Sequence, residues 1–347
     1  MRPLVSILIP AYNAERWIKQ TIASAVRQDY PNKEVILVND GSSDRTLEIA
    51  KAFESSSVKV INQENVGGPG ARNNALKHAQ GDYIQWLDHD DLLAPNKISE
   101  QIKVVESIGS DRILLSGSFG TFYFRSERAR FEPGEMWRDL SPLEYFYAKF
   151  EQDEWIHTTC WLVSRKLTEA AGPWWDIRSP DDDGEYFCRV VASSDGMRFV
   201  PAARSFWRIG NDASFSYTGQ RSVKSLSAML KTNFRCIEHF RALDDSERCR
   251  TACVTFLRNR LIYYYPDHRE MLKDIYDLAE RLGGTLSTPP LQQYEVLRPL
   301  IGWRRARWIQ ELIGGAKQKV YRALDKMIYD CARDKLSSPG KDSHYSP

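Results

Sequence analysis

The sequence contains no hydrophobic run long enough to cross a membrane. The first apolar run, Leu4 to Ile9, is too short for the hydrophobic region of a signal peptide. No other stretch of the 347 residues reaches the ~20 apolar residues that a membrane-spanning helix needs. We therefore expect a cytoplasmic protein, with peripheral attachment to the inner face of a membrane left open.

Cysteine pairs, histidine clusters and an excess of one charge are also missing. None of the six cysteines belongs to a C-x-x-C pair and no histidine cluster lies near them. This argues against a structural zinc site and favours reduced, mostly buried thiols. The 48 basic residues nearly balance the 46 acidic ones, giving a net charge of +2. Nothing in this balance indicates a nucleic acid as a partner.

Strand-like and helix-like patterns alternate over residues 4–87. Short apolar runs typical of buried strands are followed by apolar residues at helical spacing, and this order predicts a mostly parallel sheet flanked by helices. The expected strands are 4–9, 34–39, 58–61 and 83–87, and the expected helices lie within 14–25, 47–53 and 70–79.

The rest of the chain changes in character. Residues 112–210 look mixed, and residues beyond about 220 look mainly helical. The sequence therefore predicts an α/β protein with a mainly helical C-terminal region and a disordered, serine- and proline-rich tail at 337–347. In the mixed part we expect strands at 113–115, 121–124 and 161–163, and a helix after Asp183.

Polar residues follow the ends of the expected parallel strands. Tyr12 and Asn13 follow the first strand, and Asp40 follows the second. Asn65 comes after the third strand, and an acidic cluster at 88–91 comes after the fourth. Ligands of open α/β sheets bind at the carboxyl ends of the strands. The sequence therefore predicts a binding site at this edge of the sheet.

The cluster Asp88-His89-Asp90-Asp91 is the first candidate for chemistry. Carboxylates crowded at one strand end repel each other unless a cation joins them. Hard divalent ions such as Mg²⁺ take carboxylate oxygens together with substrate phosphates. The alternative is a solvated acidic turn that caps a helix. The spacing does not match a calcium-binding loop.

Two other segments suit a nucleotide diphosphate. Asp40 can accept the imide N–H of a uracil, or it only shapes its own turn. Glycines at 67, 68 and 70 precede a helix whose N–H groups can face an anion. The guanidinium group of Arg72 adds N–H donors whose geometry suits a phosphate. This segment follows the third strand and lacks the last glycine of the dinucleotide fingerprint, and no Walker lysine is present.

The run Asp181-Asp182-Asp183-Gly184-Glu185 is the last candidate. Such acidic runs are more often exposed loops and helix caps. A carboxylate poised beside a metal-bound donor could instead act as a general base.

These motifs resemble those of the family 2 glycosyltransferases, which have the GT-A fold. The resemblance implies a GT-A catalytic domain at 1–215, with a nucleotide-binding half (1–100) and an acceptor half (101–215). The helical region predicted from the pattern, at 216–336, lies beyond the resemblance. The resemblance is strong to about residue 100 and extends to about 215. Four motifs carry it in the family's order and spacing: residues 5–13, 38–44, 65–67 with 71–73, and 87–91.

The resemblance also implies roles for individual residues. Asp88 and Asp90 resemble the D-x-D pair that meets the ribose and the metal diphosphate, so they are the expected metal ligands and Mn²⁺ or Mg²⁺ is the expected cofactor. Uridine is the expected base, although thymidine offers the same imide edge. The residues implied to bind the nucleotide sugar are Pro10, Ala11, Tyr12, Asn13, Asp40, Gly67, Arg72, Asp88, His89 and Asp90.

Residues 172–175 and 182–189 resemble the acceptor side of the family. There the second acid of an acidic pair is the usual base, which points to Asp183, with Asp182 as the alternative if the register is off by one. The implied reaction transfers a sugar with inversion from a nucleotide-diphosphate sugar, such as a UDP-sugar, to an acceptor hydroxyl. A saccharide or lipid-linked saccharide in cell-surface polysaccharide or glycoconjugate synthesis is the expected acceptor.

One family feature is missing, and two other functions stay open. Relatives place a metal-binding histidine near the end of the catalytic domain, but residues 207–214 contain none, so Asn211, Asp212 or water could take its place. A non-catalytic sugar-nucleotide-binding protein is one alternative. The other is a nucleotidyltransferase, which would need a basic, glycine-rich loop that residues 10–15 do not supply.

Residues 303–328 combine apolar residues at helical spacing with an excess of basic ones. Trp303 and Trp308 lie near the start, where interfacial anchors often occur. A basic amphipathic helix of this kind can lie on an anionic membrane surface. The alternative is that the apolar stripe packs on the catalytic domain. Gly314-Gly315 is expected to interrupt the helix.

Overall fold

The computed structural model describes residues 2–210 and 222–337. These residues form two compact units. The larger unit holds residues 2–121, 130–207 and 222–289, and the smaller unit holds residues 122–129, 208–210 and 290–337. The expected α/β class with a mainly helical C-terminal region is confirmed. The expected disordered tail lies, except for its first residue, outside the described residues.

The larger unit is built on a five-stranded sheet with the strand order β3-β2-β1-β4-β8. The strands span Val5–Ala11 (β1), Lys33–Asp40 (β2), Val58–Gln63 (β3), Tyr83–Trp86 (β4) and Val163–Ser164 (β8). The first four are parallel, as expected, and β8 is antiparallel to β4. Every residue of β1 is buried, as in a parallel strand that is covered on both faces.

Successive side chains of β1 point to opposite faces of this sheet. Ile7 and Ile9 belong to a core cluster with apolar residues of three helices, namely α1 (Ile18–Val26), α2 (Thr46–Lys51) and α4 (Lys97–Ile108). Leu8 belongs to the opposite cluster, together with Ala71 and Ala75 of α3 (Gly68–His78). The nearly continuous apolar run of β1 thus fills both cores, while each helix contributes one apolar stripe.

A second sheet with the order β5-β9-β6-β7 differs from the sequence prediction. The two strands expected at 113–115 and 121–124 are one strand, because Gly117 does not break it. A Cβ at Gly117 would lie 2.1 Å from the carbonyl oxygen of Ala203, so glycine at this position of β6 allows the backbone of β9 to pack close to it. β9 was not predicted, since it has no apolar run. The strands are β5 (Leu92–Leu93), β6 (Ile113–Phe122), β7 (Arg130–Phe131) and β9 (Gly196–Arg208).

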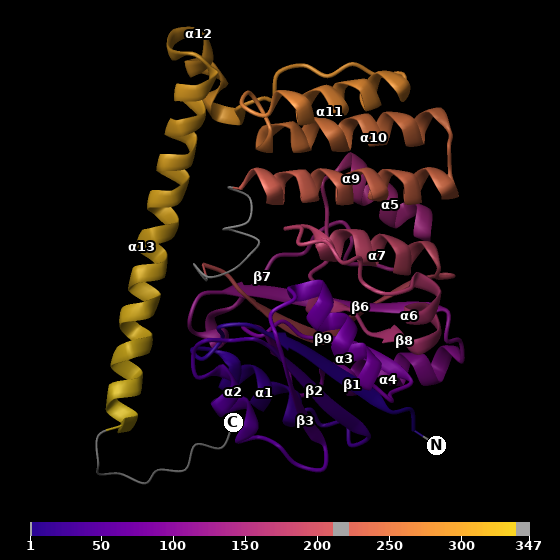
Figure 1. Ribbon diagram of the computed structural model, residues 1–347, viewed down its shortest axis with the longest axis vertical. Helices are drawn as coiled ribbons and strands as arrows, with labels where there is room; N and C mark the ends of the chain where they lie inside the picture. Colours follow the sequence, from indigo (N-terminus) through magenta and orange to yellow (C-terminus); the bar gives the residue numbers. More distant parts are fainter. Residues whose placement is uncertain (1, 211–221, 338–347) are drawn as a thin grey trace. The chain divides into compact units, whose positions relative to one another are not determined.

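Helices are layered on the α3 side of the first sheet (Figure 1). They are α5 (Pro142–Glu151), α6 (Arg165–Ala171), α7 (Asp182–Ala192), α9 (Val223–Leu243), α10 (Glu247–Arg260) and α11 (Arg269–Arg281). Phe150 of α5 stacks on Phe256 of α10 at 4.3 Å between ring centroids and also contacts Phe240 of α9. These helices share one core cluster with β1, β2 and β4. The proposed domain boundary at 215 stays a prediction.

The smaller unit is dominated by α13 (Trp303–Ser337), preceded by α12 (Arg298–Ile301). The expected interruption at Gly314-Gly315 was wrong, because α13 continues through both glycines. Two glycines cost roughly 1 kcal/mol each, which strong helix formers on either side can offset. Asp325 holds α13 to residues 124–125 by accepting hydrogen bonds from the amide of Phe124 at 2.9 Å and from Nε of Arg125 at 2.7 Å.

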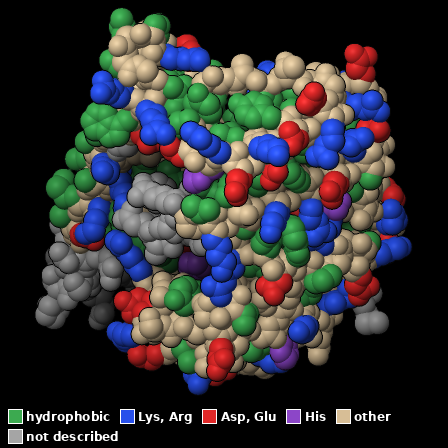
Figure 2. Space-filling model, turned by 45° about the horizontal axis from the view of Figure 1, so that its top comes forward, with side chains coloured by type: hydrophobic (Ala, Val, Ile, Leu, Met, Phe, Trp, Pro, Cys, Tyr) green, Lys and Arg blue, Asp and Glu red, His purple; other side chains and the backbone are tan. Residues whose placement is uncertain are grey.

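Three expectations from composition can be compared with the structure. All six cysteines are free thiols, five of them buried and only Cys331 exposed. Acidic and basic side chains are interspersed on the face shown in Figure 2, as expected from a net charge of +2. Across the described residues, every helix is too short or too polar to cross a membrane.

The buried carboxylate of Asp40 organises the loop between β3 and α3. Its Oδ1 accepts hydrogen bonds from Gln63 Nε2 at 2.7 Å and from the amide of Val66 at 2.9 Å, and its Oδ2 accepts one from the amide of Gly67 at 2.8 Å. Gly67 has a φ of +95°, a conformation that side chains rarely adopt. The end of β2 therefore fixes the entry into α3.

We expect Gly67→Ala to lower the thermal unfolding midpoint more than Gly109→Ala does. The backbone conformation at Gly67 costs another residue on the order of 1–3 kcal/mol, and an added Cβ would lie 2.5 Å from Nε of Arg178. Gly109 also has a positive φ, of +67°, but a Cβ there meets nothing within 4 Å. Calorimetry of both variants would measure the difference, and equal midpoints would contradict the prediction.

Candidate active site

The ends of β1 and β2 are joined by hydrogen bonds at the predicted edge of the sheet. Pro10 and Ala11 end β1 and are buried, whereas Tyr12 and Asn13 follow it and are exposed. Asn13 Oδ1 accepts a hydrogen bond from the amide of Ser43 at 2.9 Å. The pairing of β1 with β2 thus places these four residues near the end of β2, and their role in a nucleotide pocket stays a prediction.

Arg72 lies between two acidic segments that are far apart in the sequence. Its Nη2 donates to Asp88 Oδ1 at 2.9 Å and its Nη1 donates to Asp182 Oδ2 at 3.2 Å. The guanidinium carbon lies 4.4 Å from the ring centroid of Trp174. Burial alone would lower the pKa of Arg72, but Asp182, Asp88 and Asp183 raise it, so it stays charged. Its buried Nε has no hydrogen-bond partner among the described residues.

The two carboxylates beside Arg72 respond differently to the same surroundings. Burial raises the pKa of Asp182 to about 7, because Arg72 only partly offsets desolvation and the nearby Asp183 and Asp88. Burial also acts to raise the pKa of Asp88, but Arg72 and His157 together hold it below its usual value. Asp88 is therefore ionised near neutral pH, whereas the carboxyl group of Asp182 is protonated in part of the molecules.

A group that could hold a metal ion combines Asp88, Asp91 and His157. One ligand atom from each lies within 4.8 Å of the other two. His157 is buried, its Nε2 lies 3.5 Å from Asp91 Oδ2, and its Nδ1 lies 2.8 Å from Thr159 Oγ1. Desolvation lowers the pKa of His157 despite the nearby carboxylates. The amide of Thr159 donates to Nδ1 at 3.4 Å, so the proton of the neutral imidazole lies on Nε2. A metal ion bound at Nε2 would require this proton to move to Nδ1, where Thr159 Oγ1 can accept it.

Sequence reasoning missed Asp91 and His157 as members of this group. Asp91 is part of the acidic cluster, but the D-x-D spacing singled out Asp88 and Asp90 as the expected ligands. Asp90 is not in the group, and its role as a ligand stays a prediction. His157 lies between α5 and β8, in a segment with no motif, so no sequence signal pointed to it. The other positions considered, Asn211 and Asp212, lie outside the described residues.

Two predicted residues contact the site in other ways. The carbonyl oxygen of His89 accepts a hydrogen bond from Thr21 Oγ1 at 2.9 Å, which ties the acidic turn to α1. Gly67 contributes its amide to Asp40, as described above. Both act on the site through the backbone in this structure, and their contact with a nucleotide sugar stays a prediction.

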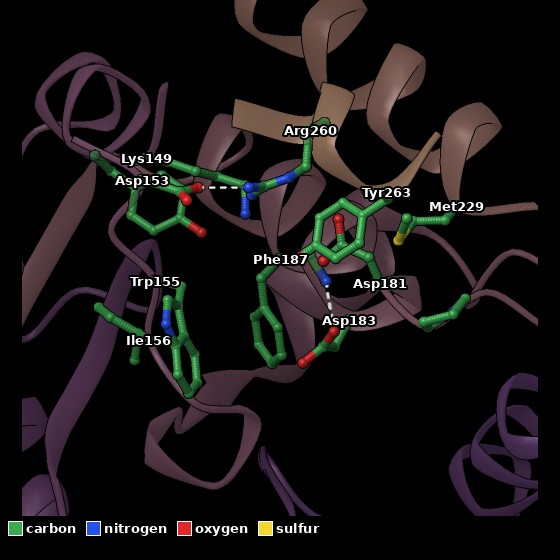
Figure 3. A pocket seen from close by; sticks show the side chains of 13 residues that line it. Lys149, Asp153, Trp155, Ile156, Asp181, Asp183, Phe187, Met229, Arg260 and Tyr263 are labelled. Atoms are coloured by element: carbon green, nitrogen blue, oxygen red, sulfur yellow. Dashed lines mark hydrogen bonds and ion pairs between the residues drawn. The ribbon is translucent and has the colours of Figure 1, made fainter. Parts of the chain in front are cut away.

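Asp183, at the start of α7, lies between the metal-binding group and a cavity. Its Oδ2 accepts a hydrogen bond from Thr158 Oγ1 at 2.8 Å, next to His157 in the chain. Asp183 also lines a cavity of about 260 Å³ (Figure 3). The lining includes side chains of α5, α7 and α10 and of the turn η4 (Leu261–Tyr263). A carboxylate at this position could accept a proton from a hydroxyl group of a ligand in the cavity.

Comparisons with known proteins agree with this geometry. Residues 6–171 match the model of the glycosyl transferase family 2. The chain is 41% identical over 113 residues to an uncharacterized glycosyltransferase of Rickettsia typhi, which is 33% of this chain and 35% of that protein. It is 43% identical over 103 residues, 29% of this chain and 41% of that protein, to the Escherichia coli UDP-Glc:alpha-D-GlcNAc-diphosphoundecaprenol beta-1,3-glucosyltransferase WfgD.

The fold has a counterpart among solved structures. S. aureus TarS 1–349 in complex with UDP-GlcNAc superimposes with a TM-score of 0.65 at 18% identity, covering 90% of this chain and 92% of that one. This likeness identifies the fold as GT-A. The chain spans less than half the length of these two curated relatives. Residues 6–171, the segment that carries the sheet and most of the site, thus match the glycosyl transferase family 2.

Proposed function

We propose that this protein transfers a sugar, with inversion, from a nucleotide-diphosphate sugar to the hydroxyl of a saccharide acceptor. The observation that carries the proposal is the position of Asp183, which lines a cavity on one side and bonds Thr158, beside His157, on the other. The family match over residues 6–171 supports the reaction class. The names of WfgD and of the TarS complex, which both contain a UDP-sugar, favour a UDP-sugar donor.

The nucleotide base is proposed to bind between Tyr12 and Asp40. A carboxylate offers about four acceptor positions, and three on Asp40 are used by the β3–α3 loop. The remaining position can accept the imide N–H of uracil. Tyr12 is 48% exposed at the end of β1 and offers a ring face to the base. Thymine would present the same imide edge.

Asp88, Asp91 and His157 are the residues proposed to hold Mn²⁺ or Mg²⁺. Two carboxylates and a neutral imidazole fit such an ion, and the imidazole favours Mn²⁺. When bound, the ion would stabilise the negative charge of the leaving diphosphate. Arg72 contributes a second positive charge, and its unpartnered Nε can donate to a diphosphate oxygen.

Asp183 is proposed to accept the proton of the attacking hydroxyl. The hydrogen bond from Thr158 fixes the orientation of its carboxylate, and the amide of Gly184 donates to its other oxygen at 2.9 Å. A hydroxyl in the cavity would approach from one side of Asp183, while the diphosphate would leave toward Arg72 and the metal ligands. Attack and departure on opposite sides correspond to inversion of the anomeric carbon.

The helix α13 is proposed to bind an anionic membrane surface, at the inner face, through residues 303–328. Asp325 faces residues 124–125, whereas a row of large apolar side chains on other sides of the helix is exposed. At 3.6 residues per turn, Lys319 and Lys326 border this row, as in helices that lie on lipid headgroups. The exposed apolar side chains are Trp308, Leu312, Ile313, Val320, Leu324, Met327 and Ile328.

A membrane position would bring the enzyme to a lipid-linked acceptor. The name of WfgD contains a diphosphoundecaprenol-linked sugar, which is such an acceptor. Basic residues near an anionic surface contribute about 1 kcal/mol each. We therefore propose a lipid-linked saccharide as one form of the acceptor.

We expect His157→Ala to weaken Mn²⁺ binding by at least about tenfold, because the variant loses one of three protein ligands. Calorimetric titration of Mn²⁺ in the presence of UDP measures this affinity. His78→Ala, at an exposed histidine far along the sequence from the site, serves as the control. Unchanged affinity in His157→Ala, with loss only in Asp90→Asn, would instead assign the ion to the D-x-D pair.

Asp183→Asn should lower the turnover of glycosyl transfer by roughly 10²–10⁴-fold, the usual effect of losing a general base. UDP affinity should stay unchanged, because Asp183 does not touch the nucleotide pocket. Transfer is measured as UDP release from UDP-sugars with p-nitrophenyl glycosides as acceptors, and Asp195→Asn, at an exposed carboxylate after α7, is the control. If Asp182→Asn alone shows this loss, the base is Asp182.

The protein should sediment with phosphatidylglycerol vesicles at low salt and be released at high salt. Replacing Val320 and Leu324 by Asp should abolish sedimentation, because both side chains belong to the exposed apolar row. Val223→Asp, at an equally exposed valine on α9, is the control. Sedimentation that persists in the double variant, or that is absent in the unaltered protein, would contradict membrane binding by α13.

A further inference from the structure

We propose that the cavity beside Asp183 is the acceptor subsite and that it binds a neutral sugar ring, with Trp155 as the stacking platform and the Arg260–Asp153 pair as the polar clamp. This inference rests on the proposed glycosyl transfer and specifies its substrate class. The cavity volume of about 260 Å³ is close to the lower end of ligand sites, roughly 300 Å³. It suits one or two sugar rings and excludes a wide polymer groove.

The walls of the cavity come from segments that are far apart in the sequence. Lys149 lies on α5, and Asp153 and Trp155 lie just after it. Arg260, the last residue of α10, reaches across so that its Nη1 contacts Asp153 Oδ1 at 2.6 Å (Figure 3). The ring of Tyr263 borders the same space. The clamp is therefore closed by a helix that follows the family-matched segment.

Trp155 presents a fixed aromatic surface to the cavity. Its side chain is 41% exposed, which is unusual for a tryptophan packed among other rings. Its ring centroid lies 5.3 Å from that of Phe119, 5.1 Å from that of Trp207 and 6.1 Å from that of His157. These neighbours hold the indole in one orientation before any ligand binds. The C–H face of a pyranose ring can pack on such a surface while its hydroxyls stay free.

The charges that line the cavity argue for a neutral ligand. Two cations, Lys149 and Arg260, face three carboxylates, those of Asp153, Asp181 and Asp183. An anionic sugar would therefore meet no net positive charge. Alternating donors and acceptors instead match hydroxyl groups, each of which can both donate and accept.

Lys149 carries unused hydrogen-bonding capacity at this site. Its side chain is nearly fully buried, yet its ammonium group has no hydrogen-bond partner among the described residues. Although desolvation opposes ionisation, Tyr145 and Asp181 raise the pKa of Lys149, which keeps three N–H donors available. Because Lys149 lines the cavity, hydroxyl groups of a ligand there could accept hydrogen bonds from these donors.

The same geometry sets which hydroxyl reacts. Asp183 is in the wall of the cavity, so a ring stacked on Trp155 and held by the clamp presents one edge to its carboxylate. Lys149, Arg260 and Asp153 would bind hydroxyls of the other edge. These residues therefore determine the sugar and the linkage position, while Asp183 serves any acceptor that fits.

The test measures binding of p-nitrophenyl glycosides by saturation-transfer difference NMR in the presence of UDP and Mn²⁺. The panel contains neutral hexosides and N-acetylhexosaminides, together with the glucuronide and a hexose phosphate as anionic members. We expect at least one neutral glycoside to bind and the anionic members not to bind. Trp155→Ala and Arg260→Gln should each weaken that binding by at least tenfold, while UDP affinity stays unchanged.

Arg248→Gln is the matched control for Arg260→Gln. Arg248 lies on the same helix and also forms an ion pair with the end of α5, at Glu151, but it is 64% exposed and outside the cavity. If Arg260→Gln does not fold, Asp153→Asn tests the same clamp without removing a buried cation. Unchanged binding in Trp155→Ala, or preferred binding of the anionic members, would overturn the subsite. Failure of the unaltered protein to bind UDP would overturn the proposed function instead.

Discussion

The two-sided ion pair of Arg72 is the interaction on which the rest of the site depends. Asp88 follows β4 and Asp182 begins α7, and the guanidinium between these two half-buried carboxylates offsets their mutual repulsion. Arg72 is itself fixed on the ring of Trp174, which stacks on Tyr186 of α7 at 4.1 Å. The charge and the aromatic stack together hold the start of α7, and with it Asp183, against the edge of the sheet.

Sequence patterns predicted those parts of the fold that depend on local chemistry. The parallel strands and the polar residues at their ends were found because buried strands read as apolar runs and because the motif spacing is specific. β9 was missed, since its sequence has neither a continuous apolar run nor a regular alternation and includes Pro201. His157 was missed for another reason: it joins Asp88 and Asp91 only through tertiary packing, and no neighbouring residue marks it. The glycines at 314–315 were misjudged as an interruption, because the helix on either side of them outweighed their low helix propensity.

The helices beyond the family-matched segment share the core of the sheet and line the cavity beside Asp183. α9 and α10 share the core cluster of the sheet, and the Phe150–Phe256 stack fixes α10 on α5. This packing positions Arg260 and Tyr263 at the cavity beside Asp183. In the proposed function, residues 10–91 would bind the donor, whereas the acceptor cavity also needs residues of α5, α7 and α10.

Two ion pairs connect α10 with the end of α5 and with the segment that follows it. Arg248–Glu151 and Arg260–Asp153 attach one helix to the rim of the cavity at two points, and neither contact involves a residue of the nucleotide pocket. Substitutions on α10 can therefore accumulate without disturbing donor chemistry. If the cavity is the acceptor subsite proposed above, substitutions on this helix face could change the acceptor while the donor stays the same.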